Sequence, residues 1–327
     1  MSGKIVILGF GPVGKHAAER LVRQGRQVVV AQRREPKDLP KGARFVRCDV
    51  LDAASMRNAT DGAAQVVAAF GFAYDSAVWR KAWPRAMKNL LDACEAARAR
   101  LVFFDNLYMY GPQTTPVTEE TALSNYGRKP AIRSAVTRQW MAARDAGRVK
   151  IAALRAPDFY GPGVGNSHIG DVGFGRLAQG KAATLVVPPD MPHDYAYAPD
   201  LGRMVTTLLD APDEDFGQVW HSPCAPTRSA REILAIGADA IGAKLRVSAL
   251  PLGLLPILGL GSTFLREVSE MRFTFDRPYY VDASKWKRRF WSDVTPFEIG
   301  AVETAKDFAA RLRRPAPSRL AQAAAFL

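Results

Sequence analysis

The first half of the chain alternates short apolar runs with longer segments of helical spacing, and this alternation limits the fold more than any other feature. The apolar runs are continuous, as in strands that are covered on both faces. The expected strands span residues 4–8, 27–31, 44–47, 65–69, 101–104 and 150–154. Strands that alternate with helices form βαβ units. The pattern therefore predicts an α/β fold, a Rossmann-type doubly wound parallel sheet of about six or seven strands.

Two long helices are expected over residues 76–97 and 130–146, and they would cover one face of the sheet. The first carries an apolar stripe at spacings of three and four, which is typical of a helix packed on a core. Its members are Trp79, Trp83, Met87, Leu90, Leu91 and Cys94. We interpret the stripe as core or dimer seam in preference to a cofactor box.

After Gly161 the pattern loosens into turn-rich segments with short helices, expected over 200–209 and 229–241. We predict two regions. Residues 1–160 form a Rossmann dinucleotide-binding domain, and 161–327 form mainly a small substrate-binding lobe, partly interleaved with the sheet. Open α/β sheets bind ligands at their carboxyl edge, where this lobe would lie. Residues 315–327 are expected to be a frayed end.

A glycine-rich turn follows the first expected strand directly and opens a helix. Its residues are Gly9, Phe10, Gly11, Pro12, Val13 and Gly14, a GxGxxG pattern in the required strand–turn–helix context. The glycines permit a tight turn, close approach of a pyrophosphate and close helix packing. Two alternatives stay open: a turn without a ligand, and a phosphate-binding loop ending at Lys15. The second is disfavoured because His16 stands where a Ser or Thr would help to hold magnesium.

The end of the second expected strand indicates which dinucleotide is bound. An NAD site usually has Asp or Glu there to bind the ribose hydroxyls. This chain has Gln32, Arg33 and Arg34 instead, and an arginine there accommodates the 2′-phosphate of NADP. We predict NADP(H), with solvated loop arginines as the alternative.

Charge and apolar segments exclude several classes of protein. The net charge is +13, but the basic residues are scattered and form no nucleic-acid-binding motif, so we expect an anionic small ligand and no nucleic acid. The apolar stretch 249–260 is too short and too rich in Pro and Gly for a membrane span. No membrane association is expected, and contact with a membrane surface is the alternative.

Cysteine and histidine usage argues against disulfides and metals. Cys48, Cys94 and Cys224 lie far apart and form no CxxC pair, which suits a reducing cytoplasm. The four histidines show no HxH or HExxH spacing, so no metal site is expected.

Several later segments resemble a known family. They are CDV at 48–50, VVAAFG at 66–71, LVFFDNLYMYGP at 101–112 and LRAPDFYGPG at 154–163. With the glycine turn, they resemble the extended short-chain dehydrogenase/reductases, the NAD-dependent epimerase/dehydratase family, and more narrowly its atypical members. The resemblance implies cofactor contacts from Asp49 and Val50 at the adenine, from Ala69, Phe70 and Gly71 along the ribose and phosphates, and from Pro157, Asp158 and Phe159 near the nicotinamide.

The resemblance also implies a catalytic set, which this chain matches only in part. The family uses a Ser or Thr, a Tyr, and a Lys four residues after the Tyr. Here Asn106 stands at the Ser or Thr position, and its amide can still donate a hydrogen bond to a substrate oxygen. Tyr126 matches the catalytic and ribose-contacting tyrosine, but Pro130 replaces the lysine and Lys129 is one place short. Tyr108 is a further phenol at the same strand end.

Substrate contacts are expected from Tyr108, His168, His193 and Tyr195, with Asp194 and Tyr197 as neighbouring candidates. The favoured hypothesis is an NADP(H)-dependent oxidoreductase. It would transfer a hydride to or from a carbonyl, an enone or a secondary alcohol of a fairly hydrophobic small molecule. The alternatives are a catalytically degraded NADP(H)-binding sensor or scaffold, and a nucleotide-sugar epimerase or dehydratase. By the resemblance, the two long helices would form a four-helix interface in a homodimer.

Overall fold

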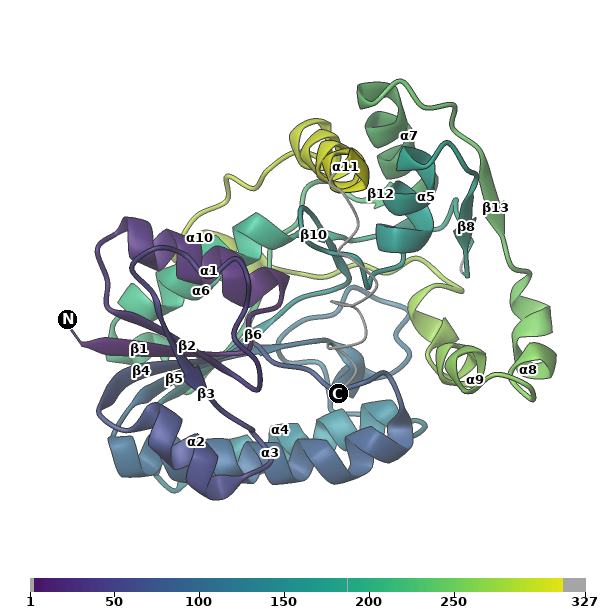
Figure 1. Ribbon diagram of the computed structural model, residues 1–327. Coiled ribbons are helices and arrows are strands. Elements are labelled where there is room, and N and C mark those ends of the chain that lie inside the picture. The colour runs from purple at the N-terminus through teal and green to yellow at the C-terminus, as the bar shows by residue number, and fades with distance from the viewer. Residues whose placement is uncertain (1–2, 187, 314–327) are drawn as a thin grey trace.

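A seven-stranded parallel sheet forms the centre of the computed structural model, which describes residues 3–186 and 188–313 (Figure 1). The strand order is β11-β6-β5-β4-β1-β2-β3. The strands are β1 (Lys4–Leu8), β2 (Val28–Gln32), β3 (Arg44–Arg47), β4 (Ala63–Ala68), β5 (Arg100–Asp105), β6 (Ile151–Arg155) and β11 (Val219–His221). The predicted Rossmann-type doubly wound fold is confirmed, and all six expected strands are present within two residues of their expected bounds.

Helices cover both faces of the sheet, because its inner strands are apolar on both sides. Adjacent residues of β1 point to opposite faces, and Val6 and Ile7 are both fully buried in different cores. One face carries α2 (Ala53–Thr60), α3 (Ser76–Ala97) and α4 (Lys129–Asp145), and the other carries α1 (Pro12–Arg23) and α6 (Ala198–Asp210) (Figure 1). This two-sided burial explains why the strands are continuous apolar runs.

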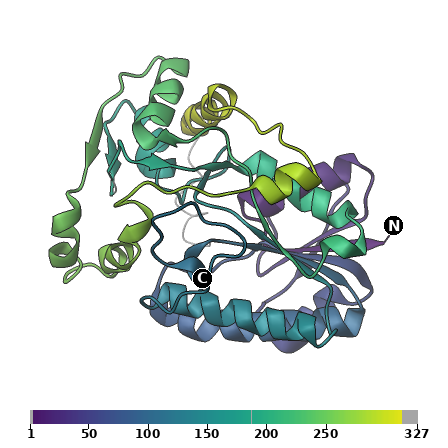
Figure 2. The same cartoon turned by 180° about the vertical axis from the view of Figure 1, so that it is seen from behind.

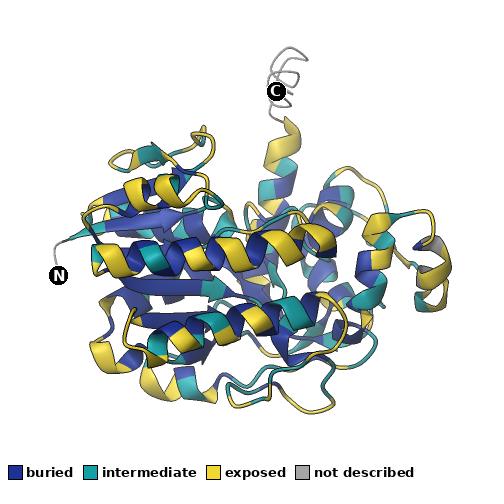
Figure 3. Cartoon of the chain, turned by 90° about the horizontal axis from the view of Figure 1, so that it is seen from below, coloured by how far each residue is buried: buried dark blue, intermediate teal, exposed yellow. Residues whose placement is uncertain are grey.

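The apolar stripe of α3 lies in the core, which is one of the two predicted alternatives. All six stripe residues are buried, from Trp79 to Cys94. The outer positions of α3 and α4 are exposed in the view from below (Figure 3). The stripe is therefore occupied by the protein's own sheet and by α4, and the exposed outer face is a separate surface.

Apart from α6 and β11, most segments after β6 form a lobe beside the carboxyl ends of the strands, which Figures 1 and 2 show from opposite sides. The lobe has its own apolar core, in which Phe174, Ile233 and Leu234 are fully buried. Its strands are β7 (Phe159–Tyr160), β8 (Ala183–Leu185), β9 (Pro192–His193), β10 (Ala196–Tyr197), β12 (Arg228–Ser229) and β13 (Val247–Ala249). Its helices include η2 (Gly170–Gly175), α5 (Arg176–Ala178), α7 (Ala230–Ala240), α8 (Leu255–Leu258), α9 (Thr263–Glu270) and α11 (Phe297–Arg313).

The short helices η1 (Tyr108–Tyr110), η3 (Asp213–Asp215), η4 (Leu252–Leu254), η5 (Arg272–Thr274) and α10 (Ser284–Arg289) complete the described elements. Within the two described ranges, no helix is both long and apolar enough to cross a membrane. The expected frayed end, 315–327, lies outside the described residues.

Candidate functional site

The glycine turn between β1 and α1 has the geometry of a phosphate-binding turn. Gly9 has a φ of +94°, and a Cβ there would lie 2.8 Å from the Ala69 carbonyl oxygen. A Cβ at Gly14 would overlap the Gly9 carbonyl oxygen, whereas a Cβ at Gly11 would have no atom within 4 Å. Gly11 is the N-cap of α1 and its N-terminus has no side-chain cap. Open space therefore lies against amides at the positive end of a helix, which fits a pyrophosphate.

The contacts of Lys15 argue against a phosphate-binding loop. Its ammonium group contacts the Asp38 carboxylate and lies 3.9 Å from Glu19. A phosphate-loop lysine would instead point at the phosphates. The dinucleotide interpretation of the turn is therefore favoured.

The carboxyl end of β2 lies beside this turn. The Gln32 side chain accepts a hydrogen bond from the Phe10 amide at 3.0 Å and donates one to the Arg34 carbonyl at 2.8 Å. Arg33 and Arg34 are both exposed. Asp49, after β3, is exposed and accepts a hydrogen bond from the Leu51 amide at 3.0 Å. The structure thus places Gln32 against the glycine turn, with no carboxylate at the last position of β2.

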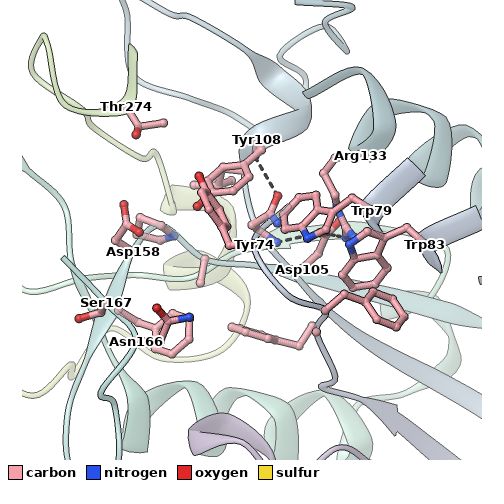
Figure 4. A pocket seen from close by; sticks show the side chains of 18 of the residues that line it. Tyr74, Trp79, Trp83, Asp105, Tyr108, Arg133, Asp158, Asn166, Ser167 and Thr274 are labelled. Atoms are coloured by element: carbon pink, nitrogen blue, oxygen red, sulfur yellow. Dashed lines mark hydrogen bonds and ion pairs between the residues drawn. The ribbon is translucent and has the colours of Figure 1, made fainter. Parts of the chain in front are cut away.

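A cavity of about 270 Å³ opens at the carboxyl ends of β4, β5 and β6 (Figure 4). Nine of the twenty residues that line it are aromatic: Phe70, Phe72, Tyr74, Trp79, Trp83, Phe104, Tyr108, Phe159 and Tyr279. Its polar lining comprises Asp105, Asn106, Arg133, Asp158, Asn166, Ser167 and Thr274. An aromatic cavity with few polar groups is the usual form of a small-molecule site.

Phe70 and Gly71, which were predicted along the ribose and phosphates, line this cavity. Pro157, Asp158 and Phe159, which were predicted near the nicotinamide, line it too. Gly9 lies close to Phe70, because a Cβ on Gly9 would come within 2.9 Å of the Phe70 Cα. The phosphate-binding turn and the cavity are therefore adjacent parts of one edge of the sheet.

A buried ion network forms the floor of the cavity. Arg133 donates from Nη2 to Asp105 Oδ1, and Arg155 Nε lies 3.6 Å from Asp105 Oδ2. The Arg133 guanidinium also stacks on Trp83, with 3.9 Å from its carbon to the ring centroid. Burial lowers the pKa of Arg133, and Asp105 opposes that change. The network places one buried cation in the cavity wall with its charge balanced by a carboxylate.

Sequence reasoning missed Arg133, although a signal was present. It belongs to the inward face of α4, where Arg133, Thr137 and Trp140 are buried at spacings of four and three. An arginine within such a stripe must have a buried partner.

The predicted catalytic residues are not brought together. Asn106 lines the cavity, and its Oδ1 accepts a hydrogen bond from the Tyr108 amide at 3.0 Å. Tyr126 is 45% exposed, and its ring packs edge-on against Phe273 with centroids 5.3 Å apart. Lys129 is fully buried, and its ammonium contacts Glu267 and lies 4.3 Å from the Tyr74 ring centroid. Neither Tyr126 nor Lys129 is among the residues that line the cavity.

The predicted substrate residues of the second half gather around Asp158. Nε2 of His193 lies 3.1 Å from Asp158 Oδ2, and Nε2 of His168 lies 3.5 Å from Asp158 Oδ1. Tyr195 is buried, with its ring centroid 4.6 Å from that of His193. Tyr108, the fourth predicted substrate residue, lies in the cavity wall and stacks on Trp79 at 6.2 Å.

The two neighbouring candidates serve other contacts. Asp194 accepts hydrogen bonds from Thr227 Oγ1 at 2.5 Å and from the Val281 amide at 2.8 Å. Tyr197 donates its hydroxyl to Glu303. In the described part of the chain, no cluster of three or more His, Cys, Asp or Glu side chains has the arrangement of a metal site.

Comparison with known proteins identifies similar sequences and folds. The sequence model of the NAD dependent epimerase/dehydratase family matches residues 5–220. No curated protein sequence matches the chain.

Three solved structures illustrate the similarity of fold. The dTDP-glucose 4,6-dehydratase DesIV of Streptomyces venezuelae, with NAD bound, is 18% identical with a TM-score of 0.77, over 95% of this chain and 98% of that one. The UDP-glucose 4-epimerase of Thermus thermophilus, in complex with NAD, is 20% identical with a TM-score of 0.74, and the match covers 93% of this chain and 98% of that one. The enzyme WbmH of Bordetella bronchiseptica, in complex with NAD+, is 17% identical with a TM-score of 0.73, and the match covers 96% of this chain and 100% of that one.

Proposed function

Since the chain belongs to the NAD-dependent epimerase/dehydratase family, we propose that it is an NADP(H)-dependent oxidoreductase of the extended short-chain dehydrogenase/reductase type. The hydride would move to or from a carbonyl, an enone or a secondary alcohol of a fairly hydrophobic small molecule. The observation that carries this proposal is the aromatic cavity, which adjoins the glycine turn at one edge of the sheet.

The glycine turn supports a dinucleotide cofactor. The open space above Gly11 and the uncapped N-terminus of α1 fit a pyrophosphate, and Phe70 connects this turn to the cavity. The three solved structures above are complexes with NAD. A nicotinamide bound at this edge would supply the hydride acceptor or donor.

The residues after β2 support NADP(H) over NAD(H). Gln32 ends the strand, where a carboxylate would bind the ribose hydroxyls and repel a 2′-phosphate. The exposed Arg33 and Arg34 follow it and can attract that phosphate. We therefore assign these two arginines to cofactor preference.

The cavity supports a hydrophobic substrate. Nine of its lining side chains are aromatic rings, and Asn106 places an amide among them at the end of β5. Rings exclude water and favour apolar ligands, while an amide can hydrogen-bond a substrate oxygen. In this proposal residues 1–160 hold the cofactor. The lobe, which belongs to the region 161–327 that is partly interleaved with the sheet, closes the substrate side.

Two further functions have a specific observation in their favour. The UDP-glucose 4-epimerase and dTDP-glucose 4,6-dehydratase structures favour a nucleotide-sugar epimerase or dehydratase. The burial of Lys129 against Glu267 and the exposure of Tyr126 favour a binding protein without turnover. We rank both below the oxidoreductase, because the aromatic cavity suits a compact apolar substrate.

The test is calorimetric titration with NADPH and NADH. We expect NADPH to bind more tightly, and Arg33→Ala/Arg34→Ala to reduce that preference by about tenfold or more, roughly 1.4 kcal/mol. Lys244→Ala/Arg246→Ala removes two exposed cations of the lobe and is the matched control. Tighter binding of NADH would disprove the NADP assignment, and no binding of either nucleotide would disprove the proposed function.

A turnover experiment follows. Wild type and Tyr126→Phe are compared with a panel of aromatic ketones and enones under NADPH. A loss of about 10²-fold or more in Tyr126→Phe would assign proton transfer to Tyr126. An unchanged rate would remove Tyr126 from the catalytic set and leave the proposed hydride transfer intact.

A further inference from the structure

Two carboxylates line the cavity, and their surroundings differ. Asp105 is neutralised by Arg133 and Arg155 and also accepts a hydrogen bond from the Asn106 amide at 2.8 Å. Within the described residues, Asp158 has no arginine or lysine as an ion-pair partner, only the two imidazoles of His168 and His193. Asp158 is therefore the carboxylate that remains available to a ligand.

Aromatic packing fixes the imidazoles behind Asp158. The ring of His193 lies between Phe275 and Tyr279, stacked on both with centroids 5.0 Å and 5.1 Å away. The His168 ring also packs on Phe275, with centroids 3.7 Å apart. Both histidines point Nε2 at the carboxylate, whereas Nδ1 of His193 is buried with no hydrogen-bond partner among the described residues. This order, with the carboxylate in front and the imidazoles behind, holds Asp158 at the cavity wall.

The groups that face Asp158 keep it charged. Burial alone would raise the pKa of Asp158, but His168 and His193 more than offset this, so that pKa is lowered. Burial lowers the pKa of His168. The phenols around the carboxylate are Tyr74, Tyr108, Tyr195 and Tyr279, and burial raises the pKa of each. At neutral pH the phenols are therefore proton donors only, and Asp158 is a charged carboxylate of the cavity wall that can accept a proton.

Figure 4 shows where this carboxylate lies among the side chains of the cavity. Asp158 lies on one side of Tyr74 and Tyr108, and the Arg133–Trp83 pair lies on the other. A ligand in the cavity would contact Asp158 at the lobe side and aromatic rings elsewhere. A hydroxyl group can donate to Asp158, whereas an anion there would meet a like charge in a site of low polarity.

We propose that Asp158 is the proton acceptor of this site, and that the cavity takes a neutral, ring-bearing secondary alcohol instead of an anionic ligand. His168 and His193 are positioning residues that hold the carboxylate. This inference rests on the proposed hydride transfer and names the group that handles the proton, a role the sequence assigned to Tyr126.

The step balances as an alcohol oxidation. The substrate O–H bond breaks and its proton passes to an Asp158 carboxylate oxygen. The electron pair of that bond forms the new C=O bond as the carbinol C–H bond breaks, and its hydride leaves to the oxidised nicotinamide dinucleotide. The reverse reaction returns the same proton from Asp158 to the carbonyl oxygen.

The first test uses two probes that differ in charge, 1-indanol and indane-1-carboxylate, with binding measured by saturation-transfer NMR. We expect wild type to bind the alcohol at least about tenfold more tightly than the carboxylate. Asp158→Asn should remove this discrimination, and Asp190→Asn, an exposed aspartate of the lobe, should keep it. Three outcomes would overturn the proposal. Wild type could bind both probes equally, it could bind neither, or Asp158→Asn could keep the same preference for the alcohol.

The second test follows pH. Binding of 1-indanol to wild type should weaken as acid protonates Asp158, and this dependence should disappear in Asp158→Asn. Labelled histidine NMR provides a readout independent of activity, because the chain has four histidines, which His168→Gln and His193→Gln would assign. In Asp158→Asn the pKa of His168 should fall, because Asp158 raises it, while His16 and His221 stay unchanged.

The third test separates this inference from the proposed function. We expect wild type to oxidise 1-indanol with NADP+, and Asp158→Asn to lose about 10²-fold or more in kcat when NADP+ is saturating for each protein, as calorimetry determines. Failure of wild type to bind NADP+ would disprove the proposed function. If NADP+ and 1-indanol both bind, no oxidation by wild type would disprove the proposed hydride transfer of this alcohol. Full activity in Asp158→Asn would overturn only the role of Asp158.

Discussion

The ammonium group of Lys129 lies against the carboxylate of Glu267, with both side chains almost completely buried. Lys129 begins α4, and Glu267 belongs to α9, so the pair connects the lobe to the sheet domain across 138 residues. Glu267 also accepts hydrogen bonds from Ser76 Oγ at 2.8 Å and from the Ser76 amide at 3.2 Å. The lysine that the sequence placed near the catalytic position is therefore engaged in the contact between two regions.

Breaking this pair on one side should destabilise the protein. In Glu267→Gln the Lys129 charge stays buried without a counter-charge, which costs about 3 kcal/mol. The double variant Lys129→Met/Glu267→Gln removes both charges and should recover most of that loss, since Met can pack on Tyr74. Urea unfolding of the wild type, both single variants and the double variant measures the free energy of unfolding. A Glu267→Gln protein as stable as the wild type would contradict the importance of the pair.

The glycine turn offers a substitution that separates folding from cofactor binding. A Cβ at Gly11 meets no atom within 4 Å, so Gly11→Ala should leave the free energy of unfolding within about 0.5 kcal/mol of wild type. The same methyl group would occupy the space expected for the pyrophosphate, and NADPH binding should weaken about tenfold or more. Gly253→Ala, also in open space, is the control for both measurements. Unchanged NADPH affinity in Gly11→Ala would place the pyrophosphate elsewhere.

The sheet was predictable because its inner strands are buried on both faces, so each is a continuous apolar run. β11 was missed because Val219–His221 is only three residues long and lies at the sheet edge. α6 begins at Ala198, two residues before its expected start, because Pro199 fits the first turn of a helix.

Only those residues of the candidate site that come just after a predicted strand could be placed from the sequence. Asn106 and Tyr108 follow β5 directly, so the sequence alone placed them at the carboxyl edge. The cluster around Asp158 depends on chain segments that are far apart. His193 is 35 residues from Asp158, and Phe275 comes from a later segment still. Local spacing carries no information on such contacts, which form only when the lobe folds over the sheet.

The homodimer stays a prediction, and α3 and α4 would form its four-helix interface. Their apolar stripes face the protein's own core, so the interface would use the exposed outer positions of these helices, including Val78, which is 41% exposed. Light scattering over a wide concentration range should give twice the mass of 35.7 kDa. Val78→Glu should then shift the mass towards the monomer, because it places a charge in the interface. A monomeric mass at all concentrations would disprove the interface.

A buried histidine should make the protein sensitive to acid. Nε2 of His221 lies 3.0 Å from the Tyr110 hydroxyl, and its Nδ1 lies 3.2 Å from the Asp282 carbonyl oxygen. Because the carbonyl only accepts, Nδ1 carries the proton of the neutral ring and Nε2 accepts from Tyr110. Burial lowers the pKa of His221 to about 3, and the nearby Arg155 adds to this effect.

The direction in which pH changes the stability follows from the protonation of His221 in the folded and unfolded states. Between pH 6.5 and about 3 the unfolded chain binds a proton at His221 that the folded protein does not. Stability is therefore complete above pH 6.5 and falls on acidification, by up to about 1.4 kcal/mol for each pH unit from this residue. His221→Gln keeps a hydrogen-bonding side chain without a titrating group, so its stability should depend less steeply on pH. Urea unfolding at pH 7, 6, 5 and 4 measures the two slopes, and equal slopes would show that His221 is not the acid-sensitive group.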